Sequence, residues 1–283
     1  MDSKRGRDLE RDIVSHLDEL HSLELPVDLE IERLLLNDEL AAVKKQDKLN
    51  FEKGLVTFSP SSASKCKREL FYKANRIGRD EQTRYPYQRR WARNGTAVHG
   101  AVQKDLLYAE KYLAKPKFKV QRTETGRPAW ERNLRQVKKF DHNEVRFQMS
   151  GMMDGILIYT PDSSRIGFEF KTKSTTIAAV GDYKMKEIQE SHKEQCIGYS
   201  LLFDLNEFIV LYESLAKDSW MKGIEAKSDL RPFYLEITDK AQKKMLDKFA
   251  KVAKMVEDGE LPDSELGKCI FCPYKSRCIG EAA

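Results

Sequence analysis

Hydrophobic residues recur at helical spacing among many charged residues in the first part of the chain. They form two sets, one of Ile13, Val14, Leu17 and Leu20 and one of Ile31, Leu34, Leu35 and Leu40. Because Pro26 separates the two sets, residues 1–50 are expected to form a pair of amphipathic helices. An apolar helix face usually packs on a core, so this N-terminal helical extension is expected to cover the main domain. Binding of a partner is the alternative.

Further segments carry helix signals. Ser59 is a good N-cap and Pro60 suits a first turn, so the basic helix that follows is expected to carry Cys66. Helices are also predicted for residues 94–113, 184–203 and 237–258. His99 falls in the first turns of the 94–113 helix.

Between residues 118 and 150 the chain is first strongly charged and then alternates between hydrophobic and polar positions. The alternation at Val145, Phe147 and Met149 predicts a strand, whereas the charged part is expected to be a loop or loose hairpin. An apolar run predicts a buried strand over residues 207–215. The order of helices, three or four strands, helix, strand and helix predicts an α/β fold with a central mixed sheet flanked by helices.

Two acidic residues and a lysine lie on a predicted β-hairpin. Asp154 follows a glycine turn at Gly151, and Glu169 and Lys171 lie on the next strand, after turn residues 161–164. Residues two apart in a strand share a face, so Glu169 and Lys171 project together and the hairpin brings Asp154 alongside them. Two such carboxylates would hold Mg²⁺ or Mn²⁺. Lys171 would orient or help deprotonate an attacking water and offset charge on a phosphate, which is the layout of a metal-dependent nuclease site.

Composition narrows the classes of protein to which the chain could belong. Of the 283 residues, 40% are hydrophobic and 34% are charged, which is ordinary for a soluble globular protein. The net charge of +5 and the isoelectric point of about 8.7 favour a nucleic-acid partner only weakly. No apolar run approaches the ~18 to 20 residues of a membrane span, and the N-terminus is too charged for a signal peptide, so a cytoplasmic location is expected. In a reducing compartment, the five cysteines favour metal or cluster binding over disulfides.

Several separated motifs agree with one nuclease family. They are Gly95-Thr-Ala-Val-His99, Gly151-Met-Met-Asp154, Glu169-Phe-Lys171 and Gln195-Cys-Ile-Gly-Tyr199. Over roughly residues 55–280 the chain resembles the PD-(D/E)XK nucleases of the RecB type, close to the iron-sulfur branch that includes AddB and the small CRISPR-associated nucleases. The resemblance implies a restriction-endonuclease-like core over residues 51–262. The metal ligands that it implies are His99, Asp154, Glu169 and the backbone carbonyl of Phe170.

The resemblance also gives a role to two residues of the predicted 184–203 helix. Gln195 and Tyr199 lie four apart and therefore share one helix face. In the family this motif positions the catalytic lysine, here Lys171, or the DNA phosphate. A buried polar pair that caps the core is the alternative.

The cysteines match the same branch. Cys66 lies near the start of the nuclease core, and three more cysteines, Cys269, Cys272 and Cys278, lie near the end. The resemblance implies a [4Fe-4S] cluster on these four thiolates, which would join residues 263–283 to Cys66. Relatives often have proline after the first cysteine where this chain has Lys67, which is not a ligand position. A zinc site is the alternative, because ligand type alone does not separate the two metals. The fifth cysteine, Cys196, is expected to be a small buried helix residue.

Arginines and aromatic residues alternate directly before the predicted helix of residues 94–113. The residues expected to bind DNA are Arg84, Tyr87, Arg89, Arg90, Trp91 and Arg93. Guanidinium groups suit phosphates, and aromatic rings suit unpaired bases. A second basic segment spans residues 122–139, where a flexible loop would close over a strand. For both segments a solvated charged loop is the alternative.

The resemblance implies a deoxyribonuclease that depends on Mg²⁺ or Mn²⁺. Relatives with this cysteine arrangement act mainly on DNA ends or single strands, so an exonuclease in phage or prokaryotic recombination, repair or replication is expected. The alternatives are a structure-specific endonuclease and a non-catalytic DNA-binding or assembly protein with a structural iron-sulfur or zinc site. The chain has no P-loop motif, so any unwinding would come from a helicase or recombinase partner.

Overall fold

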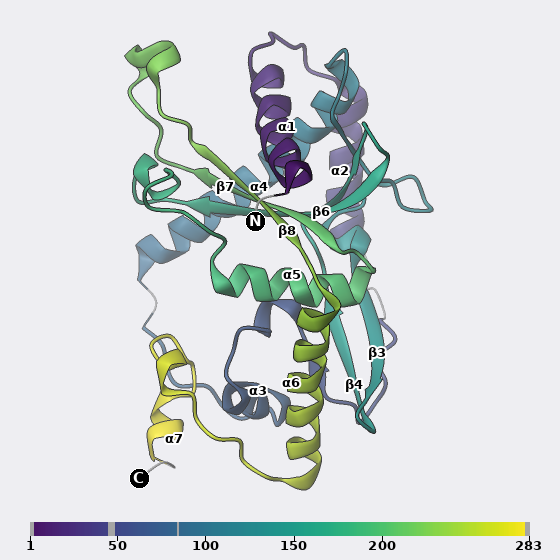
Figure 1. The fold of residues 1–283 in the computed structure, drawn as a ribbon, viewed down its shortest axis with the longest axis vertical. Helices are drawn as coiled ribbons and strands as arrows, with labels where there is room; N and C mark the ends of the chain where they lie inside the picture. Colours follow the sequence, from purple (N-terminus) through teal and green to yellow (C-terminus); the bar gives the residue numbers. More distant parts are fainter. Residues whose placement is uncertain (1–2, 45–48, 84, 281–283) are drawn as a thin grey trace.

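A computed structural model describes residues 3–44, 49–83 and 85–280 of the chain (Figure 1). The α-helices are α1 (Lys4–His21), α2 (Leu29–Lys44), α3 (Lys67–Ala74), α4 (Pro86–Tyr112), α5 (Glu190–Phe203), α6 (Asp239–Asp258) and α7 (Lys275–Gly280). The strands are β1 (Thr57–Phe58), β2 (Phe118–Val120), β3 (Gln136–His142), β4 (Val145–Gly151), β5 (Gly155–Tyr159), β6 (Ser164–Lys173), β7 (Glu207–Ser214) and β8 (Leu230–Glu236). The short 3-10 helices include η1 (Pro60–Ser62), η2 (Glu131–Leu134) and η4 (Trp220–Glu225). Within these described ranges, every helix is too short or too polar to cross a bilayer.

The strands form two mixed sheets. One has the order β2-β5-β6-β7-β8, in which β6 and β7 are parallel and the other neighbours are antiparallel. The other has the order β1-β4-β3, with β1 parallel and β3 antiparallel to β4. Helices flank these sheets, so the predicted α/β class is confirmed. The arrangement is consistent with a restriction-endonuclease-like fold.

Strands β2, β3 and β8 lie where the hydrophobic pattern predicted no strand. β3 falls within the charged segment that was expected to be a loop, and it pairs with β4 from Gln136↔Gly151 to His142↔Val145. Its residues are exposed or only half-buried, so no alternation of hydrophobic positions marks them. The loop prediction was therefore wrong for residues 136–142, which form a regular hairpin with β4.

Three helix boundaries differ from the sequence prediction. α4 begins at Pro86 rather than at residue 94, so His99 lies near its middle and not in its first turns. Most residues of its early turns are exposed, so no apolar period reveals them. α5 begins at Glu190 rather than at residue 184. Cys66 is the N-cap of α3 and does not lie inside that helix.

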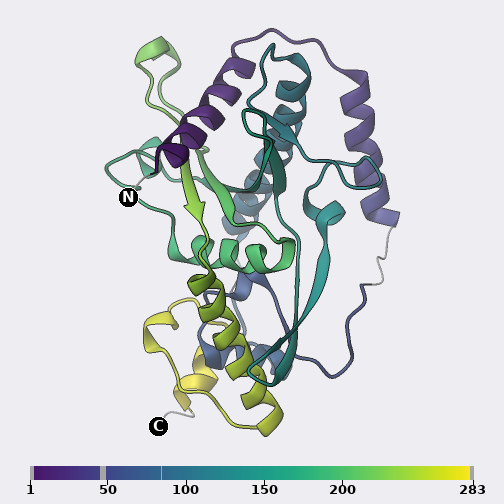
Figure 2. The ribbon, with the colours of Figure 1, turned by 45° about the vertical axis from the view of Figure 1, so that its right-hand side comes forward.

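The central strands β6 and β7 are covered on both faces. Successive residues of β7 alternate between two hydrophobic clusters. Phe208 and Val210 pack with α5 and α6, whereas Ile209 and Leu211 pack with α1 and α4. Figures 1 and 2 show α5 on one side of this sheet and α1 on the other. A polar side chain on β6 must therefore find its partners inside the protein.

The two N-terminal helices differ in how closely they pack. Four residues of α1, namely Leu9, Ile13, Leu17 and Leu20, are almost fully buried. In α2, Ile31 is buried, but more than half of each of Leu29, Leu36, Leu40 and Val43 is exposed. α1 thus forms part of the hydrophobic cluster on the sheet, and α2 covers it less completely.

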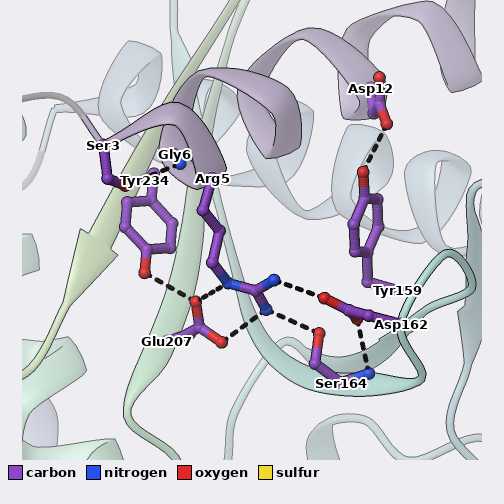
Figure 3. Close-up of polar contacts among 9 residues, drawn as sticks. All are labelled: Ser3, Arg5, Gly6, Asp12, Tyr159, Asp162, Ser164, Glu207 and Tyr234. Atoms are coloured by element: carbon purple, nitrogen blue, oxygen red, sulfur yellow. Dashed lines mark hydrogen bonds and ion pairs between the residues drawn. The ribbon is translucent and has the colours of Figure 1, made fainter.

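Polar contacts fasten the N-terminal end of α1 to the sheet (Figure 3). Arg5 Nη2 donates to Glu207 Oε2 at 2.7 Å and to Ser164 Oγ at 2.8 Å. The same guanidinium pairs with Asp162 in the turn between β5 and β6. Tyr234 on β8 donates to the other oxygen of Glu207 at 2.7 Å. One arginine therefore connects α1 to β6, β7 and the turn that positions the hairpin.

Gly198 on α5 is a position where the packing requires glycine. A Cβ there would lie 2.9 Å from both Cα and Cβ of Pro60, and the Cα belongs to the backbone and cannot swing away. We expect Gly198→Ala to lower the free energy of unfolding by about 1 to 3 kcal/mol, as measured by urea denaturation. Gly100→Ala is the matched control, because nothing lies within 4 Å of that added Cβ on exposed α4. It should stabilise by about 0.5 to 1 kcal/mol. Equal midpoints for the two variants would contradict this account of the α5 contact.

Candidate active site

The β5–β6 hairpin brings Asp154 beside Glu169. Gly155 pairs with Phe168 across the hairpin, so the residue before β5 lies opposite the residue after Phe168. The backbone N–H of Phe170 donates to Asp154 Oδ2 at 2.9 Å and fixes that carboxylate. Asp154 was expected on a strand, but it lies in the bend just before β5. Its side chain still reaches the predicted place beside Glu169.

β6 separates apolar from polar side chains by simple alternation. Phe168 and Phe170 enter the hydrophobic cluster beneath α1 and α4. Glu169 and Lys171 share the other face, where the Lys171 ammonium donates to Glu169 Oε1. Their projection to one side is the geometry that the sequence predicted.

Glu169 is a carboxylate that is 0% exposed. Its Oε2 has no hydrogen-bond partner among the described residues. Burial, with the charge of Asp154 as a second cause, raises the pKa of Glu169 well above its usual range. Burial opposes the charge on Lys171, but Glu169 and Asp154 outweigh it and raise the pKa of that ammonium. The raised pKa means that the surrounding groups do not fully compensate the charged form of Glu169.

His99 joins the carboxylates from the middle of α4. Its Nε2 lies 3.0 Å from Asp154 Oδ2, and its Nδ1 lies 3.3 Å from Glu131 Oε1. The edge of the ring also contacts Phe170, with the ring centroids 5.4 Å apart. Burial opposes protonation, but the hydrogen bonds to Asp154 and Glu131 raise the pKa of His99 to about 10. The histidine thus acts as a cation held between two carboxylates.

Glu131 is a site residue that the sequence reasoning missed. It begins η2 with φ of 41°, an uncommon backbone conformation for a residue other than glycine. Its N–H donates to the carbonyl of Met153 at 2.6 Å, which keeps it next to the Asp154 bend. No motif spacing connects it with the other acidic residues, because it is one glutamate in a charged segment. A histidine whose second nitrogen bonds a carboxylate is the usual arrangement behind a metal-binding histidine.

α5 supplies the two motif residues. Gln195 Nε2 donates to the Tyr199 hydroxyl at 2.7 Å, so they form the expected pair on one helix face. Burial is the main cause that raises the pKa of Tyr199, and Glu169 and Asp154 add to it, so this ring lies near both carboxylates. Cys196 between them is 0% exposed, as expected of a small buried residue.

His192, which no motif marks in the sequence, also lies close to this region. Its Nδ1 is 2.7 Å from the Tyr212 hydroxyl. Burial, followed by the charges of Lys171 and Lys173, lowers the pKa of His192 to about 4. It is therefore a neutral partner beside two lysines, and only the tertiary fold reveals it.

Cys66 and the three C-terminal cysteines are brought to one end of the molecule. In Figure 1, α7 lies beside α3, and the Tyr72 and Tyr274 rings that join them are 5.3 Å apart. Cys66 Sγ accepts from the N–H of Glu69 at 3.3 Å. Arg68 Nη1 donates to Cys278 Sγ at 3.7 Å.

The thiols also influence one another. Burial is the main cause that raises the pKa of Cys66, and Cys278 contributes. Burial, followed by the effects of Glu69, Cys66 and Cys269, raises the pKa of Cys272 to about 11. Within the described part of the chain, no group of three or more His, Cys, Asp or Glu side chains is arranged to hold a metal ion as it stands. That holds for the cysteines and for the carboxylate site.

Except for Arg84, the residues expected to bind DNA lie on the first turns of α4, residues 86–93, which are called its outer turns below. Those within the described ranges are Tyr87, Arg89, Arg90, Trp91 and Arg93, and all are exposed. Arg84 lies outside the described residues. Figure 1 shows the first turns of this helix, in blue, extending beyond the sheet. The helix therefore carries these residues and His99 on one rigid element.

Comparisons with known proteins identify no family. No protein-family model matches the chain, and no curated protein matches it. Among solved structures, SSO0001 matches with a TM-score of 0.45 and 14% identity over 89% of this chain and 96% of that one. The alkaline exonuclease LHK-Exo from Laribacter hongkongensis matches with a TM-score of 0.43 and 11% identity over 81% and 96%. Its complex with dAMP matches with a TM-score of 0.40 at the same identity and coverage. Likenesses this weak carry no argument about function.

Proposed function

We propose that this chain is a nuclease that hydrolyses phosphodiester bonds of DNA with the help of Mg²⁺ or Mn²⁺. The observation that carries the proposal is Glu169, a fully buried carboxylate with one oxygen unpartnered among the described residues, beside Asp154. Burying a charged group without full compensation is costly, and such groups cluster at functional sites. A residue kept only for packing would avoid that cost.

The donor set suits a hard divalent cation. Asp154, Glu169 and the carbonyl of Phe170 offer oxygen, and His99 offers nitrogen. As they stand, His99 and Asp154 bond each other, so a cation would take the place of the histidine's proton. When bound, it would act as a Lewis acid toward the phosphate.

Lys171 contributes as a donor. Glu169 and Asp154 raise the pKa of Lys171, so its protonated form is favoured in the site as it stands. Its ammonium is therefore suited to offset negative charge that develops on the phosphate. Gln195 and Tyr199, joined by their hydrogen bond, form a polar wall close to the carboxylates and would help orient the substrate.

We further propose that the enzyme acts as an exonuclease on DNA ends or single strands. The exposed arginines and aromatic rings of α4, which lead to His99, support a DNA substrate. A helicase or recombinase partner would supply unwinding.

Removal of either acidic ligand or of the lysine should abolish cleavage. We expect Asp154→Ala, Glu169→Ala and Lys171→Ala each to cut at least about 100-fold more slowly, because the two acidic residues would hold the cation and Lys171 would offset charge on the phosphate. The assay uses end-labelled linear and circular DNA, single- and double-stranded, with Mg²⁺, Mn²⁺ or EDTA. Glu124→Ala, an exposed acidic residue outside the site, is the control.

The same assay decides between the candidate activities. Cation-dependent loss of linear DNA alone identifies an exonuclease, and cutting of circles identifies an endonuclease. If folded Glu169→Ala cleaves as fast as wild type, the site assignment is wrong. Binding in EDTA without cutting under any condition would support a non-catalytic DNA-binding protein.

Glu131 should affect cation affinity through His99. We expect Glu131→Ala to weaken Mn²⁺ binding about 10- to 100-fold, because His99 loses the carboxylate that orients its ring. Calorimetric titration of the purified protein measures this without any substrate. Glu131→Gln keeps an acceptor for Nδ1 and should lose less. Equal affinities of Glu131→Ala and the surface control Glu124→Ala would contradict the role.

We also propose that Cys66, Cys269, Cys272 and Cys278 bind a [4Fe-4S] cluster, with zinc as the alternative. Four thiols near one end of the fold provide suitable ligands for either. Anaerobically purified protein should be brown and contain iron and sulfide, and Cys278→Ser should lose both. Cys196→Ser, the buried cysteine of α5, should retain them. A colourless protein with one zinc per chain would establish the alternative.

A further inference from the structure

The outer turns of α4 carry aromatic rings that are only partly covered. Tyr87 is 47% exposed and Trp91 is 52% exposed. Tyr85 stacks on Tyr87 with ring centroids 5.9 Å apart, and Tyr87 meets Trp91 edge-on at 5.3 Å. The rings thus hold one another in place and still present area to solvent. Large rings held in this way on a surface offer stacking partners for flat ligands.

The positive charges next to these rings belong to arginines that are not neutralised by acidic side chains within the described ranges. Arg89, Arg90 and Arg93 are exposed, and no ion pair joins them to an acidic side chain within the described ranges. Some arginines elsewhere on the surface are paired, for example Arg122 with Glu110 and Arg146 with Glu52. A cluster of available guanidinium groups next to aromatic rings complements a chain of phosphates that carries bases.

A second group of exposed apolar side chains lies beside lysines that form ion pairs. Trp220, Met221 and Ile224 at the tip of the β7–β8 hairpin are almost fully exposed. Two lysines beside them are paired, Lys217 with Asp229 and Lys222 with Asp218. Charge complementarity therefore points to α4, and not to this tip, as the surface for a polyanion.

The α4 rings lie in line with the proposed cutting site. Trp91, Gly95 and His99 follow one another at four-residue intervals and so lie along one side of the helix. A Cβ on Gly95 would lie 3.3 Å from Thr172 Oγ1, so this side passes the end of β6 directly after Lys171. The eight residue steps from Trp91 to His99 span about 12 Å along the helix. At about 3.4 Å per stacked nucleotide, that distance corresponds to three or four nucleotides.

We propose that Tyr87 and Trp91 form a stacking platform for unpaired bases of single-stranded DNA, three or four nucleotides from the bond that is cut. The inference rests on the proposed nuclease function and adds which part of the substrate is recognised and where. Arg90, which lies roughly a quarter turn from Trp91 around the helix, holds the phosphates of that segment. Bases inside a duplex stack on each other and cannot use the platform, so it selects single strands over blunt duplex ends.

Binding in EDTA tests the platform without any cleavage. Fluorescence anisotropy is measured with labelled oligo(dT) of 2, 4, 8 and 16 nucleotides (on the order of the site sizes of single-strand binders) and with blunt duplex of the same length as the longest. Trp91→Ala should weaken binding of the two longest single strands on the order of tenfold and leave blunt duplex unchanged. Trp220→Ala, which removes an exposed tryptophan at the tip of the β7–β8 hairpin, should bind as wild type does. Equal affinities of Trp91→Ala and Trp220→Ala for the longest strand would overturn the proposal, as would an equal loss for duplex.

Cleavage kinetics separate this inference from the nuclease proposal. Trp91→Ala should raise KM for single-stranded DNA longer than about four nucleotides with little change in kcat, because the ring lies about 12 Å along the helix from His99. If wild type cuts nothing but Trp91→Ala still loses single-strand binding, the nuclease proposal fails and the platform stands. If wild type cuts and Trp91→Ala keeps the wild-type KM, the nuclease stands and the platform fails.

Discussion

The repulsion between two neighbouring carboxylates in a place shielded from water determines how the rest of the site is arranged. Asp154 and Glu169 face each other because β5 and β6 pair in a fixed register, and the sheet is covered on both faces. His99, Lys171 and the backbone N–H of Phe170 compensate part of the negative charge of these carboxylates. One carboxylate oxygen is still left over among the described residues, which is the reason to expect a cation there. The hydrophobic clusters provide the rigidity that keeps this unfavourable arrangement together.

The parts of the site that are local in the chain could be read from the sequence. Asp154, Glu169 and Lys171 belong to one hairpin, and a strand places every second residue on the same face, so their proximity follows from spacing alone. The mixed α/β class could also be read, because long apolar periods mark most of the helices and the buried strand β7. His99, Gln195 and Tyr199 come from two distant helices, and motif resemblance, not physical spacing, picked them out.

Other features depend on tertiary contacts and left no local signal. β3 pairs with β4 although its residues are largely exposed, so it lacks the alternation that reveals a half-buried strand. The start of α4 at Pro86 was hidden for a similar reason, since its first turns pack against little. Glu131 can be recognised as a site residue only once the fold places its carboxylate beside His99. In each case the backbone or the charge is satisfied by a partner far away in sequence.

The fastening of α1 has a consequence for how the protein is made. Arg5 bonds Glu207, which lies 202 residues later in the chain. A ribosome adds about 5 to 20 residues per second, so the helix waits about 10 to 40 s for this partner to be synthesised. During that interval the apolar side with Leu9, Ile13 and Leu17 can meet α4, β5 and β6, but the part of its packing surface that β7 supplies is missing. This helix therefore completes its packing only after β7 and β8 have emerged, and until then its apolar side favours aggregation of the nascent chain.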